Sequence, residues 1–307
     1  MILEARYTSL SLVKRKDKNM ISGKTKICAL IGDPVEHTMS PAMHNAAFKK
    51  LGLDYLYIPF RVKPEQLPQA VAGLRALNVR GFNITIPHKV SVIPLLDGLD
   101  PLAEKIGAVN TVVNDGGMLW GFNTDAEGFL RALMGCGIEP GSKNIVILGA
   151  GGASRAISYI LAAKGANLTI LNRKLELDWA EDIARLIHQD LARDVKVGEL
   201  TPRRLAIALD GADILVNATS VGMSPAGGKS PVPAKLLKSS LVVFDIVYNP
   251  IMTRLLKEAK DAGARVIGGI DMLAWQGALA FEKWTGRPAP LDLMRREAIK
   301  MLESHED

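Results

Sequence analysis

Short apolar runs alternate with amphipathic stretches along most of the chain, a pattern that predicts strands alternating with helices. In the first part of the chain, the predicted strands are residues 26–32, 54–62 and 79–86, and the predicted helices are residues 40–52 and 65–78. A further pair of strands is expected on either side of Gly116-Gly117. This alternation predicts an α/β domain with a largely parallel sheet.

A second α/β unit is predicted after a bridging helix at residues 123–137, where Thr124 and Glu127 fit a capping box. Residues 143–174 have the strand–helix–strand pattern of a βαβ unit. More strands are expected at 212–220, 241–249 and 264–269. The stretch from residue 271 onward is predicted to be helical and to return to the first domain.

The composition is that of an ordinary globular protein, with 48% hydrophobic and 23% charged residues among 307. Most of the net charge of +6 lies at the N-terminus, because residues 1–26 carry +5. We interpret residues 1–25 as a flexible basic leader, and the remaining chain lacks the basic footprint of a nucleic-acid-binding protein.

No apolar run has the length of a membrane helix, and the N-terminus has no pattern of an export signal. Cys28 and Cys136 lack metal-ligand spacing and are expected to be reduced thiols. These features predict a cytoplasmic protein with no membrane partner.

Residues 83–90 contain a charge in an unfavourable predicted position. Pro87 fits the first position of a helix, which places Lys89 in the first helical turn, where the backbone dipole is positive. Misplaced charges often mark functional sites, so Lys89 is a candidate, although a solvated surface lysine would give the same pattern.

A glycine-rich loop follows a predicted buried strand and opens the helix of the βαβ unit. Gly149 and Gly151 fit the first two glycines of the dinucleotide-binding fingerprint, and Ser154 replaces the third. Such a loop lets the backbone approach a pyrophosphate at a helix N-terminus. The sequence therefore predicts a dinucleotide site.

The end of the second strand of this unit indicates which dinucleotide binds. An NAD site carries an acidic residue there, whereas this chain has Asn172-Arg173-Lys174. Two cations can pair with the 2′-phosphate of NADP. Because Glu176 and Asp178 follow closely, NADP is the predicted cofactor and NAD stays open.

Two hydroxyl side chains, Thr38 and Ser40, stand just before a predicted helix, with Ser40 as its N-cap. Hydroxyls and free backbone N–H groups can donate to a carboxylate, so we expect an acidic small-molecule substrate here. His37, His44 and His88 have no acidic or cysteine ligands clustered with them, and we therefore expect no metal.

Eight motifs, taken together, resemble the shikimate dehydrogenase family, which includes the quinate/shikimate dehydrogenases. They are HTMSPAMHN, GFNITIPHK, GAVNTVV, GFNTDAEGF, GAGGAS, NATSVGM, YNP and MLAWQ, in the order of the family. They extend over nearly the whole chain, which makes the combined resemblance strong.

The resemblance implies an N-terminal α/β substrate-binding domain with a mostly parallel sheet, a Rossmann-type dinucleotide-binding domain and C-terminal helices that return to the first domain. We expect residues 26–124 plus 271–307 to form the substrate-binding domain and residues 125–270 to form the Rossmann domain. The active site is expected in the cleft between them.

The implied activity is the reversible NADPH-dependent reduction of 3-dehydroshikimate to shikimate, a step in the chorismate pathway of aromatic amino-acid biosynthesis. Two alternatives stay open: an NAD-preferring quinate/shikimate dehydrogenase and, more remotely, a ligand-sensing protein without catalysis. The sequence does not determine the oligomeric state, and a homodimer stays open.

The resemblance also assigns roles to single residues. Lys89 and Asp125 match the catalytic pair, which we expect to titrate as a unit. The substrate positions match Thr38, Ser40 and Tyr248 at the carboxylate and Thr85, Asn110, Asp125 and Gln276 at the ring hydroxyls. The cofactor positions match Gly149, Ala150, Gly151, Gly152, Ala153, Asn172, Arg173, Lys174, Thr219, Gly269 and Met272.

Overall fold

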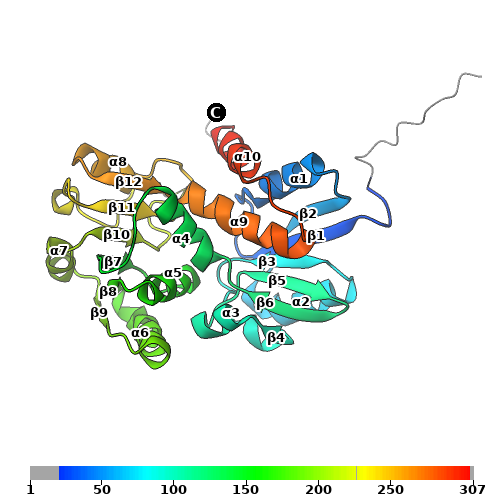
Figure 1. Cartoon of the computed structure of the whole chain (residues 1–307), viewed down its shortest axis with the longest axis horizontal. Coiled ribbons are helices and arrows are strands. Elements are labelled where there is room, and N and C mark those ends of the chain that lie inside the picture. Colours follow the sequence, from blue (N-terminus) through cyan, green and yellow to red (C-terminus); the bar gives the residue numbers. More distant parts are fainter. Residues whose placement is uncertain (1–20, 226, 305–307) are drawn as a thin grey trace, which may run out of the picture.

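The computed structural model describes residues 21–225 and 227–304, which fold into two six-stranded sheets flanked by helices (Figure 1). The two sheets confirm the predicted α/β class. Of the predicted basic leader, only residues 21–25 lie within the described residues. The exact domain boundaries stay a prediction, which the division into two sheets supports.

The first sheet has the strand order β2-β1-β3-β5-β6-β4. Its strands are β1 (Lys26–Gly32), β2 (Tyr55–Arg61), β3 (Gly81–Ile84), β4 (Gly98–Leu99), β5 (Thr111–Asp115) and β6 (Met118–Phe122). Its helices are α1 (Ser40–Lys50), α2 (Leu67–Ala76) and α3 (Pro101–Ile106). β1 pairs in parallel with β2 and β3, whereas β5 is antiparallel to both β3 and β6.

These strand directions bring four separate segments to one edge of the first sheet. The chain leaves β1 toward Thr38 and Ser40, and it leaves β3 toward Lys89. Because β5 runs the other way, Asn110 precedes it at this same edge, and Asp125 follows β6 there. The sheet topology therefore gathers candidate residues that lie far apart in sequence.

The second sheet is entirely parallel, in the order β12-β11-β10-β7-β8-β9. Its strands are β7 (Asn144–Leu148), β8 (Asn167–Asn172), β9 (Val195–Glu199), β10 (Ile214–Asn217), β11 (Val242–Asp245) and β12 (Arg265–Gly268). Its helices are α5 (Gly152–Ala163), α6 (Leu177–Leu191), α7 (Pro202–Asp210) and α8 (Arg254–Asp261). This is the doubly wound order of a Rossmann fold, whose switch point lies between β7 and β10.

Both faces of the second sheet are covered, which explains why its strands are continuous apolar runs. Ile145 and Ile147 of β7 point to the core shared with α5 and α6, and Val146 and Leu148 point to the core shared with α7 and α8. The sequence pattern assigned no elements to residues 175–211, which contain α6, β9 and α7.

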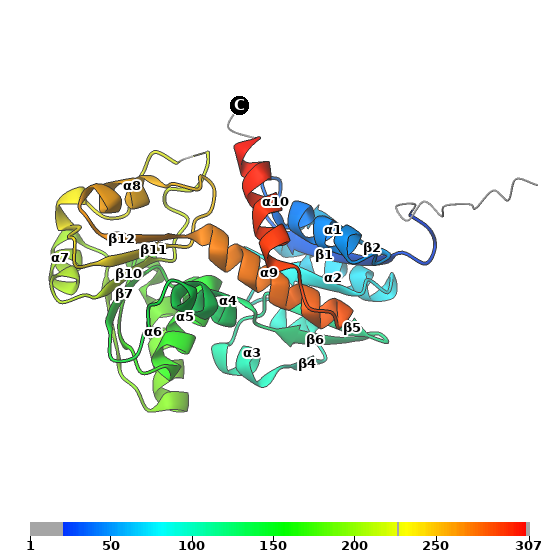
Figure 2. The same ribbon diagram turned by 45° about the horizontal axis from the view of Figure 1, so that its top comes forward.

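Two helices connect the sheets. α4 (Asp125–Gly135) leads from the first sheet to the second, and α9 (Gly269–Thr285) returns and crosses α4 (Figure 2). The last helix, α10 (Leu291–Glu303), packs against α1, so the C-terminal helices return to the first sheet as predicted.

A buried polar cluster joins the ends of β10 and β11. The carboxylate of Asp245 accepts hydrogen bonds from Asn217 Nδ2 at 2.9 Å and from Thr253 Oγ1 at 2.7 Å. The Val247 amide donates a third bond. Burial nevertheless raises the pKa of Asp245 from 3.8 to about 6, because the desolvation of the carboxylate outweighs these three donors.

This shift predicts a pH-dependent stability. Since the folded pKa is about 6 and the reference value is 3.8, the folded state binds more protons between these values. The free energy of unfolding should then fall by about 3 kcal/mol as the pH rises through this window. We expect the Asp245→Asn variant to lack this fall in denaturant titrations from about pH 3 to about pH 7, spaced about 0.5 unit apart.

The matched control is Asp292→Asn, which removes an exposed carboxylate from α10. This control should follow the wild-type curve. If the free energy of unfolding changed equally with pH in wild type and in Asp245→Asn, the raised pKa of Asp245 would be contradicted.

Candidate active site

Lys89 and Asp125 form a buried ion pair at the edge where the segments of the first sheet converge. Lys89 Nζ lies 2.5 Å from Asp125 Oδ2, and the two side chains are only 14% and 6% exposed. A solvated surface lysine, the alternative reading of the sequence, is therefore wrong. A buried charge pair needs further hydrogen bonds to offset desolvation, and the structure supplies them.

The helix predicted to begin at Pro87 is wrong. Residues 86–92 form consecutive turns after a cis Ile86–Pro87 peptide. The His88 amide donates to the Thr85 carbonyl and the Lys89 carbonyl accepts from the Val109 amide at 2.7 Å. Lys89 therefore does not face a helix N-terminus, and its ammonium is held by the carboxylate of Asp125.

Asp125 is the first residue of α4, whereas the predicted helix begins at residue 123, and the predicted capping box of Thr124 and Glu127 is wrong because Thr124 makes no side-chain cap hydrogen bond. Asn123 Oδ1 instead accepts from the amides of Asp125 and Ala126 at 3.1 and 3.2 Å. Asn123 thus fixes the start of α4 and leaves the carboxylate of Asp125 free for Lys89.

Asn110 connects the ion pair to α9. Its side-chain amide donates to Asp125 Oδ1 at 2.9 Å and to Gln276 Oε1 at 3.4 Å. Its side-chain oxygen Oδ1 accepts from the Thr124 amide at 2.7 Å. The structure therefore brings Lys89, Asp125, Asn110 and Gln276 into one hydrogen-bonded group.

Because α4 and α9 cross closely, Gln276 of α9 lies within hydrogen-bonding distance of Asn110. A Cβ on Gly128 would lie 2.9 Å from both the Cβ and the amide nitrogen of Gln276. Because Gly128 has no side chain, α9 can approach α4 this closely.

The hydroxyls of Thr38 and Ser40 lie together in front of α1. Thr38 Oγ1 donates to Ser40 Oγ at 3.2 Å and accepts from the Ser40 amide at 3.3 Å. Ser40 is the first helical residue, so the prediction that Ser40 is the N-cap is wrong; Met39 holds that position. Both hydroxyls nevertheless stand at the helix start.

Two other predicted substrate positions border the same region. Thr85 follows β3, and its Cγ2 lies 2.2 Å from where a Cβ on Gly32 would be, so the close approach requires glycine there. Tyr248 follows β11 but packs against the core of the first sheet with α1 and α9. Burial raises the pKa of Tyr248.

The glycine loop makes a tight turn that requires glycine at its first position. Gly149 has φ +95°, in the left-handed region, and a Cβ there would lie 2.9 Å from Thr219 Cγ2. Ser154 Oγ donates to the Gly149 carbonyl at 2.7 Å, which fastens the loop to α5 in place of the third glycine. Around Gly151, a Cβ would meet no atom within 4 Å, so the start of α5 is open to an anion.

This loop lies directly against the lysine of the ion pair. A Cβ on Gly152 would lie 2.9 Å from Lys89 Cβ. The predicted catalytic pair and the predicted diphosphate loop are therefore neighbours across the two sheets. Ala150 and Gly151 belong to this loop, Ala153 lies in the first turn of α5, and Gly269 and Met272 lie in the first turn of α9.

The predicted 2′-phosphate site follows β8. Asn172 is buried and donates to the Glu176 carbonyl, whereas the Arg173 side chain is 74% exposed. Arg173 Nη2 lies 2.5 Å from Glu176 Oε1, and this carboxylate raises the pKa of Arg173. Lys174 begins a short 3₁₀ turn beside it. An acidic side chain therefore pairs with one of the two predicted cations.

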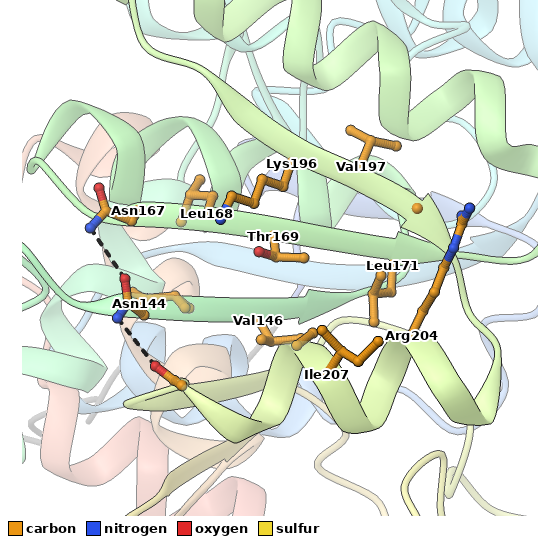
Figure 3. Close-up of a pocket in the computed structure, with 14 residues that line it drawn as sticks. Asn144, Val146, Asn167, Leu168, Thr169, Leu171, Lys196, Val197, Arg204 and Ile207 are labelled. Carbon is orange, nitrogen blue, oxygen red and sulfur yellow. Dashed lines mark hydrogen bonds between the residues drawn. The ribbon is translucent and has the colours of Figure 1, made fainter.

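A groove on the second sheet lies away from this site. It has a volume of about 390 Å³ and lies between α7 and the strands β7, β8 and β9, on the outer face of the second sheet (Figure 3). None of the predicted site residues lines it.

Neither a metal site nor a membrane span is found in the part of the chain that the structure describes. Its His, Cys, Asp and Glu side chains form no group of three that could hold a metal ion. Among its helices, none is both long and apolar enough to cross a bilayer.

Sequence reasoning missed three buried polar side chains beside the site: Asn83 donates to the Asn110 backbone carbonyl, Asn123 accepts from the Asp125 amide, and the Tyr57 hydroxyl donates to Asn83. Asn83 had a detectable signal, since a polar residue inside an apolar strand must find hydrogen-bond partners. Tyr57 had none, because a tyrosine in a strand is most often a packing residue.

Comparison with known proteins agrees with this arrangement. Residues 30–112 match the family model described as "Shikimate dehydrogenase substrate binding domain", and residues 269–299 match "Shikimate 5'-dehydrogenase C-terminal domain". A relative from Dehalococcoides mccartyi, named shikimate dehydrogenase (NADP(+)), is 48% identical over 90% of this chain and 96% of its own. The chain belongs to the shikimate dehydrogenase family.

Solved structures of this family have the same fold. A shikimate dehydrogenase crystallised with NADP+ is 44% identical, with a TM-score of 0.84, over 92% of this chain and 98% of its own. A quinate dehydrogenase from Corynebacterium glutamicum, solved with NAD, is 31% identical, with a TM-score of 0.81, over 90% of this chain and 99% of its own. The family thus includes members that differ in cofactor and substrate.

We predict that Gly128→Ala forces α9 away from α4. A methyl group at 2.9 Å from the Gln276 backbone cannot be accommodated by rotating a side chain. Overpacking of this kind costs about 1–3 kcal/mol, measurable as a lower free energy of unfolding.

The control is Gly135→Ala on the same helix, where a Cβ would meet nothing within 4 Å. It should be neutral or stabilising, since alanine is the better helix former. Equal effects of the two substitutions would contradict a tight crossing at Gly128.

Proposed function

We propose that the protein is an NADP-dependent shikimate dehydrogenase that reversibly reduces 3-dehydroshikimate to shikimate in chorismate biosynthesis. The observation that carries the proposal is the buried Lys89–Asp125 pair, which lies against Gly152 of the glycine loop. A proton-transfer pair beside a dinucleotide loop is what the oxidation of an alcohol requires. The relatives named above support this activity.

Separate groups of site residues serve proton transfer and substrate binding in the proposed reaction. Bound NADP supplies or accepts the hydride. Lys89, whose ammonium is held by Asp125, is placed to exchange a proton with the substrate oxygen, and Asn110 orients Asp125. Thr38, Ser40 and Tyr248 are placed to hold the carboxylate, and Thr85, Asn110 and Gln276 to hold the ring hydroxyls.

The open start of α5 would hold the diphosphate, and Arg173 and Lys174 would hold the 2′-phosphate. The glycine loop fits a diphosphate, because Gly149, Gly151 and Ser154 leave the N-terminus of α5 uncovered. At the 2′-phosphate, Arg173 would have to share its guanidinium with Glu176.

An NAD-preferring quinate/shikimate dehydrogenase is the second candidate. The Arg173–Glu176 pair favours it, because Glu176 partly neutralises the cation that a 2′-phosphate needs. The intact ion pair argues against a non-catalytic sensor. Acceptance of quinate, a homodimer and a cytoplasmic location stay predictions from the sequence.

Initial rates with shikimate or quinate, each with NADP+ or NAD+, test the proposed function. We expect shikimate with NADP+ to give the highest kcat/KM. Arg173→Ala should lower kcat/KM for NADP+ by about tenfold or more and leave NAD+ nearly unchanged, since the lost contact is a charge-assisted one.

The control is Arg185→Ala on α6, because Arg185 is an exposed arginine with the same i,i+3 pairing to a carboxylate. It should behave as wild type with both cofactors. Dominant turnover of quinate with NAD+ would favour the second candidate, and no turnover of any pair would refute a dehydrogenase of this substrate class.

Lys89→Ala should reduce kcat by about a hundredfold or more, the usual scale for the loss of acid–base catalysis, with a much smaller change in KM. Asp125→Asn should act on the same step, so the double variant should be little slower than Lys89→Ala alone. Steady-state kinetics with saturating NADP+ measures both.

Lys50→Ala, at an exposed lysine at the end of α1, is the control and should keep wild-type kcat. Unfolding curves must accompany these assays, because removing one partner of a buried pair costs about 3–5 kcal/mol. A folded Lys89→Ala variant with near-normal kcat would refute the role of Lys89.

A further inference from the structure

Asn217 is a buried polar residue at the end of β10, and its side chain closes the turn that follows this strand. Its Oδ1 accepts from the amide and from the hydroxyl of Thr219, at 3.1 and 2.7 Å. Its Nδ2 donates to the Val221 carbonyl at 3.2 Å, and Thr219 Oγ1 in turn accepts from the Val221 amide at 3.1 Å. One side-chain amide therefore holds both ends of the turn at residues 217–221.

This turn lies against the diphosphate loop. A Cβ on Gly149 would lie 2.9 Å from Thr219 Cγ2 and 3.1 Å from the Ala218 carbonyl oxygen. The loop and the turn follow β7 and β10, which pair at the switch point of the sheet, where a dinucleotide lies across the carboxyl ends of the strands. The position of the turn therefore limits the space around the diphosphate loop.

The carboxylate of Asp245 determines which way the Asn217 amide faces. It is buried and accepts three hydrogen bonds, which come from Asn217 Nδ2, the Val247 amide and the Thr253 hydroxyl. Because an ionised carboxylate only accepts, the amino group of Asn217 must face Asp245, and its oxygen must then face Thr219. Without the carboxylate, the Asn217 amide could turn over and point its own N–H groups at the N–H of Thr219, which would open the turn.

We propose that Asp245 is a positioning residue for the dinucleotide, because it fixes the Asn217 amide that holds the turn at residues 217–221 against the diphosphate loop. This inference rests on the dinucleotide site of the proposed function. The effect of Asp245 reaches the cofactor through Asn217 and Thr219, two residues whose contacts with each other depend on the orientation of one amide.

The test is the dissociation constant for NADP+, measured by isothermal titration calorimetry without substrate. Asp245→Ala should raise this constant about fivefold to tenfold, the scale of one hydrogen bond. Asp245→Asn should stay within about twofold of wild type, because its side-chain oxygen can still accept from Asn217 and the Thr253 hydroxyl can accept from its amide. With saturating NADP+ and shikimate, kcat of Asp245→Ala should stay within about twofold of wild type, since the ion pair of the first sheet is intact.

Thr253→Val is the matched control, because it removes a different donor from the same buried carboxylate. Thr253 Oγ1 donates to Asp245 Oδ2 and also accepts from the Leu256 amide at the start of α8, so this variant should lower the free energy of unfolding. The bond from Asn217 to Asp245 Oδ1 remains, and the dissociation constant for NADP+ should equal that of wild type. A general loosening of the second sheet would instead raise this constant in both variants.

Asn217→Ala separates an effect through Asn217 from any other, and it tests the same turn if Asp245→Ala does not fold. It removes the amide itself and should raise the dissociation constant for NADP+ at least as much as Asp245→Ala does. Adding Asp245→Ala to Asn217→Ala should leave the constant where Asn217→Ala alone puts it.

Wild-type affinity for NADP+ in either folded alanine variant would overturn the inference, and so would additive effects or an equal loss in Thr253→Val. Failure of the proposed function gives a different result, a wild type that binds NADP+ but does not oxidise shikimate. A wild type that binds no NADP+ would overturn both.

Discussion

The arrangement of the candidate site depends on one interaction, the buried contact between Lys89 and Asp125. Two opposite charges removed from water are stable only when they are close and their remaining hydrogen-bonding capacity is satisfied. Asn110 bonds the second carboxylate oxygen, and Asn123 caps α4 so that Asp125 starts the helix. The pair therefore holds the turn after β3, the strand entry at β5 and the first residue of α4 in one geometry.

The second constraint is the close approach of backbone segments, which glycine makes possible at two points. Gly152 lets the diphosphate loop lie against the Lys89 side chain, and Gly128 lets α9 bring Gln276 to Asn110. A larger side chain at Gly152 would push the diphosphate loop away from Lys89, and one at Gly128 would push α9 away from α4. The geometry of the site therefore depends on the lack of a side chain at Gly128 and Gly152 as well as on the polar residues.

Several predictions were right about the residue and wrong about the local structure. Lys89 was singled out because a helix was expected at Pro87, yet residues 86–92 are turns. Thr124 and Glu127 fit a capping box, yet Asn123 makes the cap and Glu127 pairs with Arg131. Local propensity rules treat a short segment alone, whereas here contacts with β5 and α4 decide its conformation. The surface elements α6, β9 and α7 were missed because no motif marked them.

By itself, the sequence determined the α/β class, the glycine loop and the identity of the main candidate residues, because these depend on apolar periodicity and on motifs that are local in the chain. Only the tertiary structure decided that Lys89 faces Asp125, that Arg173 pairs with Glu176, and that Asn83 bonds both Tyr57 and Asn110. These contacts join residues from separate strands and helices, and their distances follow from strand order, strand direction and helix crossing. No local pattern encodes such distances, because they are set by how the whole chain packs.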